Sequence, residues 1–144
     1  MAVIDLICYG TILAQRETIR ESPFSVTLKD LPDSEARKKA TAAMGGVIEL
    51  FNEQNEADLD LNDAPVAFNG SWARWRTLIH DVLYGETMGY MDVLTNGPYV
   101  YYVVVEVPED CFVDMRESIL LVLDTFTVHG QTIPNAIKIG RAHV

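Results

Sequence analysis

The sequence has few cysteines, few basic residues and no long apolar run. No apolar stretch reaches the roughly 18 residues that a membrane-spanning helix needs, so the chain is not expected to cross a membrane. The two cysteines, Cys8 and Cys111, are too few and too far apart for the framework of a small disulfide-rich domain. Both are expected to be buried free thiols, and together with an N-terminus that lacks a basic signal-peptide start this favours a cytoplasmic protein.

Positive charge is scarce, because 11 Lys and Arg face 21 Asp and Glu and leave a formal charge of −10. Nucleic-acid binding needs a basic surface, so no nucleic-acid partner is expected. Phosphate-binding glycine loops, the Gly-x-Ser-x-Gly elbow, Cys-x-x-Cys pairs and the His-Glu-x-x-His zinc motif are all missing. The sequence therefore predicts no cofactor and no metal site, and it argues against an enzyme.

One acidic stretch partly resembles a calcium-binding loop, because Asp58, Asp60 and Asn62 alternate as oxygen ligands would. However, Asp63 stands where such a loop needs glycine, and Asn69 stands where it needs a bidentate glutamate. Leucines alternate with these acids, which favours a half-exposed strand over residues 57–61 instead.

The length and the 49% hydrophobic content predict a single domain over residues 1–144 with one real core, since no linker or repeat interrupts the chain. Apolar spacing predicts a helix from Asp33 to Phe51 and a second helix over 72–83 capped by Ser71. Strands are expected over 2–9 and 25–28 and an extended segment over 65–69, whereas residues 11–21 fit either an extended arm or a short helix.

The strongest strand signal is a hairpin, in which two apolar runs over 90–95 and 99–107 flank Asn96-Gly97. A third helix is expected after Pro108, with an apolar face from Phe112 to Phe126, followed by a last strand over 136–139. This order of elements predicts an α+β fold, a mostly antiparallel sheet of four to six strands with about three helices packed largely on one face.

Almost all of the net charge comes from the middle of the chain. Residues 51–110 hold eleven acidic and two basic residues, a balance of −9. A patch of this kind attracts cationic partners, although a solvated loop that only keeps the protein in solution has the same composition. The densest part, a candidate binding surface for a basic partner, consists of Glu53, Glu56, Asp58, Asp60 and Asp63.

Aromatic residues supply further candidate contacts for a partner. Trp72, at the start of the expected second helix, is the tryptophan expected to be exposed, whereas Trp75 is expected to cover the sheet. Tyr99 and Tyr101 share one face of their strand and offer rigid contact area. Aromatic pairs also stabilise a hairpin without any partner, so both interpretations stay open.

Histidine offers the one catalytic alternative. His80 lies where it could act with Glu86 or Asp92 as a general acid or base, if those groups meet in a pocket. A partly buried histidine with an ordinary structural role has the same sequence context, and His129 near a helix end fits a capping role.

These features favour a non-enzymatic, acidic protein-binding module that inhibits a basic partner, as toxin-immunity and anti-defence proteins do. One alternative is a structural subunit that self-associates into a homo-oligomer through hairpin edges or through the segment around Trp72. The other alternative is a small enzyme that uses His80 with nearby carboxylates.

Overall fold

The computed structural model describes residues 10–18, 32–82, 86–128, 130–131 and 133–136. The strands are β1 (Thr11–Thr18), β2 (Ala67–Asn69), β3 (Trp72–Asp81), β4 (Thr87–Asn96) and β5 (Tyr99–Pro108). The helices are α1 (Asp33–Asn55) and α2 (Phe112–Thr125), with short 3-10 turns η2 (Leu61–Asp63) and η3 (Glu109–Cys111). None of the helices in these ranges is long and apolar enough to cross a membrane.

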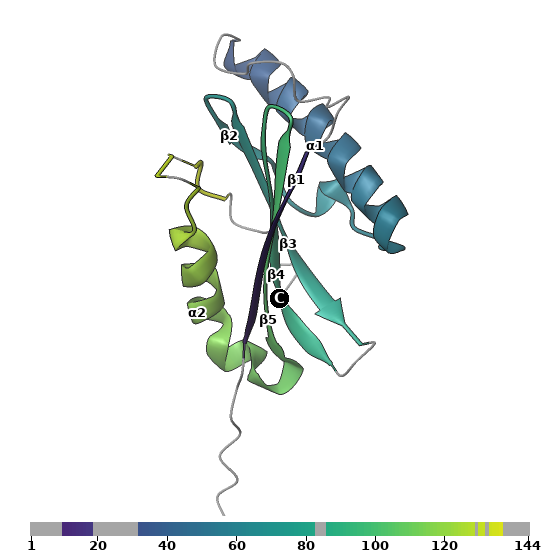
Figure 1. Ribbon diagram of the computed structural model, residues 1–144, viewed down its shortest axis with the longest axis vertical. Helices are drawn as coiled ribbons and strands as arrows, with labels where there is room; N and C mark the ends of the chain where they lie inside the picture. Colours follow the sequence, from purple (N-terminus) through teal and green to yellow (C-terminus); the bar gives the residue numbers. More distant parts are fainter. Residues whose placement is uncertain (1–9, 19–31, 83–85, 129, 132, 137–144) are drawn as a thin grey trace, which may run out of the picture.

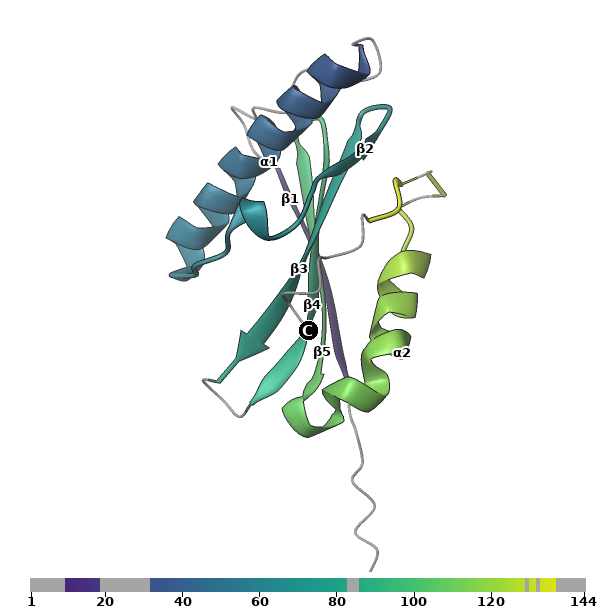
Figure 2. The same cartoon turned by 180° about the vertical axis from the view of Figure 1, so that it is seen from behind.

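The strands form one antiparallel sheet in the order β1-β5-β4-β3-β2. Helix α1 packs on one face of this sheet and helix α2 on the other (Figures 1 and 2). The predicted α+β class and antiparallel sheet are confirmed. In the described part of the chain, however, the α-helices number two rather than three, and they cover opposite faces rather than largely one.

Helix α1 confirms the prediction made from its apolar spacing. Ala36, Ala40 and Ala43 lie buried on the side that faces the sheet, and such small side chains let a helix come close to its neighbours. A Cβ added at Gly45 would lie 3.3 Å from the side chain of Leu61, so a glycine there makes room for η2.

The helix predicted over 72–83 is wrong, because these residues form β3 and Gly70-Ser71 is a hairpin loop. Trp72, Arg74 and Arg76 point to the α2 face, while Ala73 and Trp75 point to the α1 face. The side chains of this strand are buried on both faces of the sheet, but two of those on the α2 face are arginines, which rarely lie in a core. The sequence therefore lacks the apolar pattern that would identify a buried strand.

The hairpin of β4 and β5 is confirmed, but its turn lies one residue later than expected. The loop is Gly97-Pro98, and Asn96 is still in the strand, paired with Tyr99. Gly97 has φ +59° while no positive φ occurs at Asn96, which is the pattern of a type II′ turn. This shift sets the whole register, down to Thr87 opposite Pro108.

The remaining strand and cysteine predictions are partly confirmed and partly wrong. Residues 11–18 form strand β1, the expected strand over 57–61 is a loop that leads into η2, and residues 67–69 are extended as predicted. The expected strands over 2–9 and 25–28, most of that over 136–139, and also Cys8 and His129, lie outside the described residues. Cys111 is buried and disulfide-bonded, so the free thiol expected there is wrong, and the cytoplasmic location loses that support.

A buried ionic cluster joins α2 to the sheet. Asp92 of β4 is fully buried and accepts hydrogen bonds from Nε and Nη2 of both Arg74 and Arg76. Arg74 also donates to the carbonyl oxygens of Leu123 (2.7 Å) and Pro134 (3.3 Å), and Arg76 donates to Asp124 at 2.8 Å. Burial lowers the pKa of Arg76, but the hydrogen bonds and charges of the two aspartates raise it by more, so its net pKa is raised.

Candidate functional site

The acidic residues singled out from the sequence are all exposed and lie at the C-terminal end of α1 and in the segment that follows it. Glu53 and Glu56 lie at the negative end of the helix dipole, where acidic side chains are unfavourable. Glu56 also adopts a left-handed conformation (φ 50°, ψ 40°) that usually selects glycine. Helix stability therefore does not explain the residue at this position.

Asn52 fixes the chain where it leaves the helix. Its Nδ2 donates to the carbonyl oxygen of Leu59 at 2.8 Å, and the amide of Leu59 donates back to its Oδ1 at 2.9 Å. The amide of Ala57 donates to the backbone oxygen of Asn52 at 3.0 Å. These bonds close a tight loop that holds Glu56 and Asp58 at the end of α1.

This loop forms one wall of a groove of about 480 Å³, which we call the acidic groove. The other side comes from the last residues of β3 and from the middle of β4 and β5. Eight of the lining residues are apolar, four are acidic, and the other two are Asn55 and His80. The lining residues are Phe51, Asn55, Glu56, Ala57, Asp58, Leu59, Leu78, Ile79, His80, Asp81, Val82, Met91, Val104 and Glu106.

The charge of the acidic groove has one sign. Four carboxylates line it, from Glu56, Asp58, Asp81 and Glu106, and its described lining contains no lysine or arginine. Glu106 accepts a hydrogen bond from Oγ1 of Thr87 at 3.3 Å. Because apolar walls lower the local dielectric constant, carboxylates in such a groove attract cations more strongly than carboxylates on an open surface.

The groove also borders an open edge of the sheet. Strand β2 pairs with β3 only along Trp72–Arg74, so in the described ranges no strand lies beside Trp75–Asp81 on that edge. Leu78, Ile79 and Asp81 belong to this open edge and line the groove. An extended peptide could therefore pair with β3 while its side chains reach the acidic loop.

The remaining acids of the predicted surface lie outside the groove. Glu53 is exposed on α1 but does not line the groove. Asp60 accepts a hydrogen bond from the amide of Asn62 at 2.9 Å, and Asn62 lines a separate hollow that also includes Arg37. Asp63 follows Asn62 in η2. The structure thus brings two of the five predicted acids, Glu56 and Asp58, to one concave site.

The aromatic candidates lie on the opposite face of the sheet, toward α2. The exposure expected at Trp72 is wrong, since its ring is 5% exposed, stacks 5.7 Å from Tyr101 and donates to Gln131 Oε1. Tyr99 is 40% exposed, and the guanidinium of Arg16 lies 5.3 Å from its ring centre. The acidic and aromatic candidates do not form one surface.

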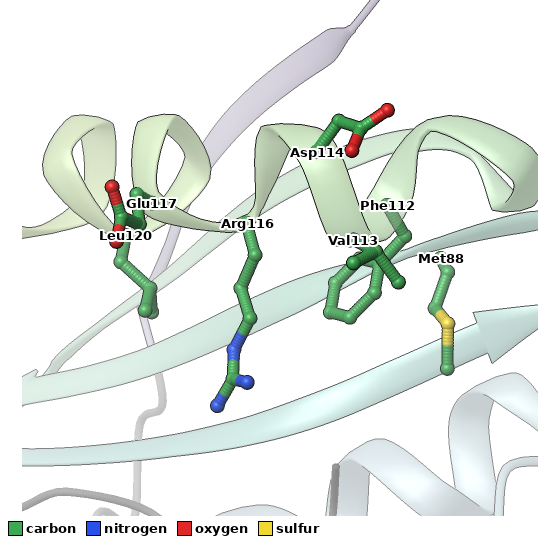
Figure 3. A pocket seen from close by; sticks show the side chains of 7 residues that line it. All are labelled: Met88, Phe112, Val113, Asp114, Arg116, Glu117 and Leu120. Carbon is green, nitrogen blue, oxygen red and sulfur yellow. The ribbon is translucent and has the colours of Figure 1, made fainter.

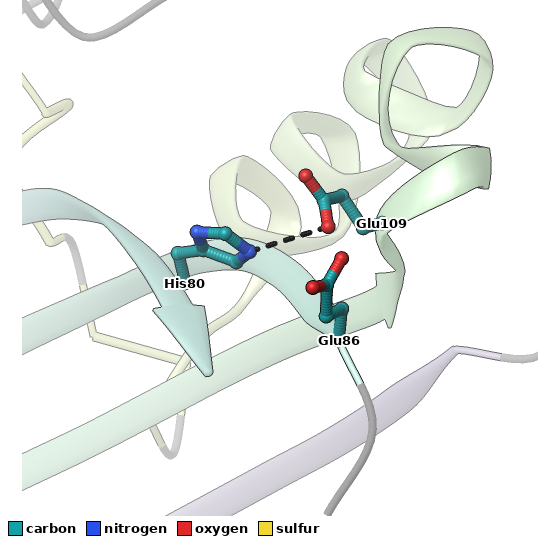
Figure 4. Close-up of side chains that lie close together, drawn as sticks. All are labelled: His80, Glu86 and Glu109. Atoms are coloured by element: carbon teal, nitrogen blue, oxygen red, sulfur yellow. Dashed lines mark ion pairs between the residues drawn. The ribbon is translucent and has the colours of Figure 1, made fainter. Parts of the chain in front are cut away.

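His80 does meet two carboxylates, but not as the sequence suggests. Its Nε2 lies 3.4 Å from Oε2 of Glu109, and Glu86 completes the group (Figure 4). A hydrogen bond shared with Glu109 raises the pKa of Glu86, and the same bond, with help from His80, lowers that of Glu109. Asp92 is buried in the arginine cluster instead. Sequence reasoning missed Glu109, although the correct hairpin register places it opposite Glu86.

A second hollow, of about 600 Å³, runs along α2 (Figure 3). Phe112, Val113 and Leu120 line it together with Met88 and three charged residues of both signs. Arg116, one of these, donates from Nε to the hydroxyl of Tyr90 at 3.0 Å. Because the charges in this hollow are of both signs, they favour no particular class of ligand.

No protein-family model, curated protein or solved structure matches this chain.

Proposed function

We propose that this protein is a non-enzymatic binding module that docks a basic segment of a partner protein into the acidic groove. The observation that carries the proposal is the combination of a mostly apolar lining, four carboxylates and no lysine or arginine among the described residues of one concave site. A segment that alternates apolar residues with lysine or arginine complements both features.

One acid of the groove, Glu56, is placed at a cost to the fold, which supports a binding role. A carboxylate at a helix C-terminus is unfavourable by roughly 0.3–1 kcal/mol, and a non-glycine residue in the left-handed region adds to that cost. Glu56 has both disadvantages. Residues that break local rules without structural gain are expected at functional sites.

The partner that fits the acidic groove best is a basic protein that acts on nucleic acid. A basic protein that acts on nucleic acid presents cationic residues at its own active surface, so an acidic module bound there blocks that surface. We infer an inhibitor of this kind, comparable to toxin-immunity or anti-defence proteins, that acts in the same compartment as its target. Electrostatic steering would make the association fast and strongly dependent on salt.

The first test uses a defined probe, a fluorescein-labelled peptide of alternating lysine and leucine, with a glutamate–leucine peptide as its control. Fluorescence anisotropy measures binding to the full chain, and ¹⁵N NMR maps the perturbed amides. We expect binding of the cationic peptide alone, with shifts concentrated at Asp58, Leu78 and Asp81. Shifts centred on α2 or spread evenly over the surface would contradict the proposal.

Charge-reversal variants test whether the groove itself binds. The variant Glu56→Lys/Asp58→Lys changes two groove carboxylates, and Glu49→Lys/Glu53→Lys makes the same net change at exposed helix positions outside the groove. The groove variant is expected to weaken peptide binding roughly tenfold or more beyond the control. Equal losses in both variants would mean that net charge alone attracts the peptide. Capture from native lysate, eluted with a salt gradient and compared between the same two variants, then identifies the natural partner.

A second candidate function, self-association, follows from the other edge of the sheet. Among the described strands β1 pairs only with β5, and Ile12 and Leu13 on it are 62% and 55% exposed. An open edge with exposed apolar residues can pair with a second copy. Light scattering over a range of concentrations tests this, because a stable dimer of the native chain that Ile12→Lys dissociates would favour it. A monomer at every concentration would exclude it.

A further inference from the structure

Three side chains converge at the end of the sheet where β3 ends and β4 begins (Figure 4), and of these His80 also lines the acidic groove. His80 comes from the end of β3, Glu86 immediately precedes β4, and Glu109 immediately follows β5. Each offers one ligand atom, and these atoms all lie within 4.8 Å of one another. Figure 4 shows the imidazole and both carboxylates turned toward the same point.

The register of the sheet, rather than chance contact of long side chains, brings this group together. Thr87 of β4 pairs with Asp81 on one side and with Pro108 on the other. His80 precedes Asp81, Glu86 precedes Thr87 and Glu109 follows Pro108, so each ligand is next to one of these three paired residues. The amide of Glu109 also donates to the carbonyl oxygen of Glu86 at 2.9 Å, which ties the two backbones together.

We propose that His80, Glu86 and Glu109 bind a divalent transition-metal ion, with zinc as the best fit. Ligands about 2.0–2.1 Å from a tetrahedral zinc ion lie about 3.3–3.4 Å from one another. The 3.4 Å between Nε2 of His80 and Oε2 of Glu109 matches that spacing. An imidazole ligand favours zinc and related metals over calcium and magnesium, which take oxygen ligands.

The charges around the group also favour a cation. Two carboxylates lie close together, and among the described residues the one ion pair to either of them is that from His80 to Glu109. Like charges at this distance repel each other unless a proton or a cation lies between them. A divalent ion would neutralise both carboxylates and bind a neutral imidazole at the same time.

The accessibility of the group determines the kind of site. His80 is 41% exposed and Glu109 is 37% exposed, so solvent reaches the group from outside the sheet. Three protein ligands with one position left for water is the arrangement of an open zinc site rather than of a closed structural one. Because the ligands come from three strand ends, bound metal would also link β3, β4 and β5 and stabilise the folded chain.

The test uses the full chain without a histidine tag, stripped of metal with a chelator. Zinc chloride is titrated in by calorimetry, and magnesium and calcium chloride are titrated in parallel. We expect one equivalent of zinc to bind, no comparable binding of the other two ions, and a higher melting temperature with zinc. Cobalt(II) added in place of zinc is expected to give the intense visible absorption of a four- or five-coordinate site.

Variants locate the site. His80→Ala and Glu109→Gln are each expected to weaken zinc binding by more than about tenfold. The control Glu117→Gln/His143→Ala removes an exposed carboxylate of α2 and a histidine near the end of the chain, and it should bind zinc like the native chain. Circular dichroism confirms that each variant is folded. Zinc binding that persists in folded His80→Ala, or native protein that binds no zinc, would overturn the proposal.

The proposed zinc site shares His80 with the lining of the acidic groove, whereas Glu86 and Glu109 lie outside that lining. The groove variant Glu56→Lys/Asp58→Lys should keep its zinc affinity, and Glu109→Gln, a change outside the groove lining, should not reproduce the loss of peptide binding caused by the groove variant. Each proposal can therefore fail while the other holds.

Discussion

The buried carboxylate of Asp92 permits the sharpest test of how helix α2 is held on the sheet. Asp92→Asn keeps the shape of the side chain but removes the charge that both Arg74 and Arg76 contact. Removing one partner of a buried ion pair costs about 3–5 kcal/mol, because the other charge stays buried without compensation. Arg76 keeps its contact with Asp124, and Arg74 keeps two carbonyl oxygens. We therefore expect a loss near the lower limit, about 3 kcal/mol.

Urea denaturation followed by circular dichroism measures this loss. With a slope of about 1–3 kcal/mol per molar urea, the midpoint should fall by about 1–3 M. Asp124→Asn is the matched control, because this aspartate belongs to the same cluster but is 52% exposed. Its loss should be at most about 1 kcal/mol, as for surface ion pairs.

The comparison between the two variants decides the outcome. Equal losses for Asp92→Asn and Asp124→Asn would refute the reasoning, because burial would then make no difference to the strength of the pair. A triple variant, Arg74→Met/Asp92→Leu/Arg76→Met, removes all three buried charges together. It should be less destabilised than Asp92→Asn alone, since no charge remains buried without a partner.

Three further predictions concern the backbone and the loop. Gly89→Ala should destabilise the protein by more than about 2 kcal/mol in the same urea assay. The added Cβ would overlap the carbonyl oxygen of Val105 and lie 2.8 Å from the Cα of Glu106. A neutral result would show that the strands separate easily. Glu56→Gly should raise the unfolding free energy by about 1 kcal/mol while it weakens binding of the cationic peptide, and a loss of stability would contradict the assigned left-handed geometry. Asn52→Ala removes two hydrogen bonds to Leu59 and should cost about 1–2 kcal/mol; the same change should also weaken peptide binding, and unaltered binding would mean that the loop needs no such clamp.

Local patterns in the sequence determined the helices α1 and α2 and the hairpin of β4 and β5. Apolar residues at three- and four-residue spacing specify a helix wherever the buried face is made of ordinary apolar side chains. The glycine at 97 likewise marks the hairpin, because its positive φ depends only on the turn itself. These signals arise within a few residues, so a single sequence carries them.

Strand β3 shows where such reasoning fails. Its α2-facing positions include Arg74 and Arg76, which the sequence presents as surface residues and the fold buries against Asp92. The carboxylate that compensates these arginines lies on the next strand, so only the tertiary structure shows the pairing. In the sequence alone, the spacing of Trp72, Trp75 and Ile79 fits a helix. The same error placed Trp72 on the surface, whereas it lies in the core beneath α2.

The acidic groove and the His80 group also combine features that the sequence determines with features that only the fold determines. The sequence by itself determined the acidic character of residues 53–63 and the exposure that such charges require, because burying an unpaired carboxylate is costly. Only the tertiary structure decided which acids share a groove and that Glu109 joins His80 and Glu86. Both results depend on strand register, and a turn displaced by one residue changes every cross-strand neighbour.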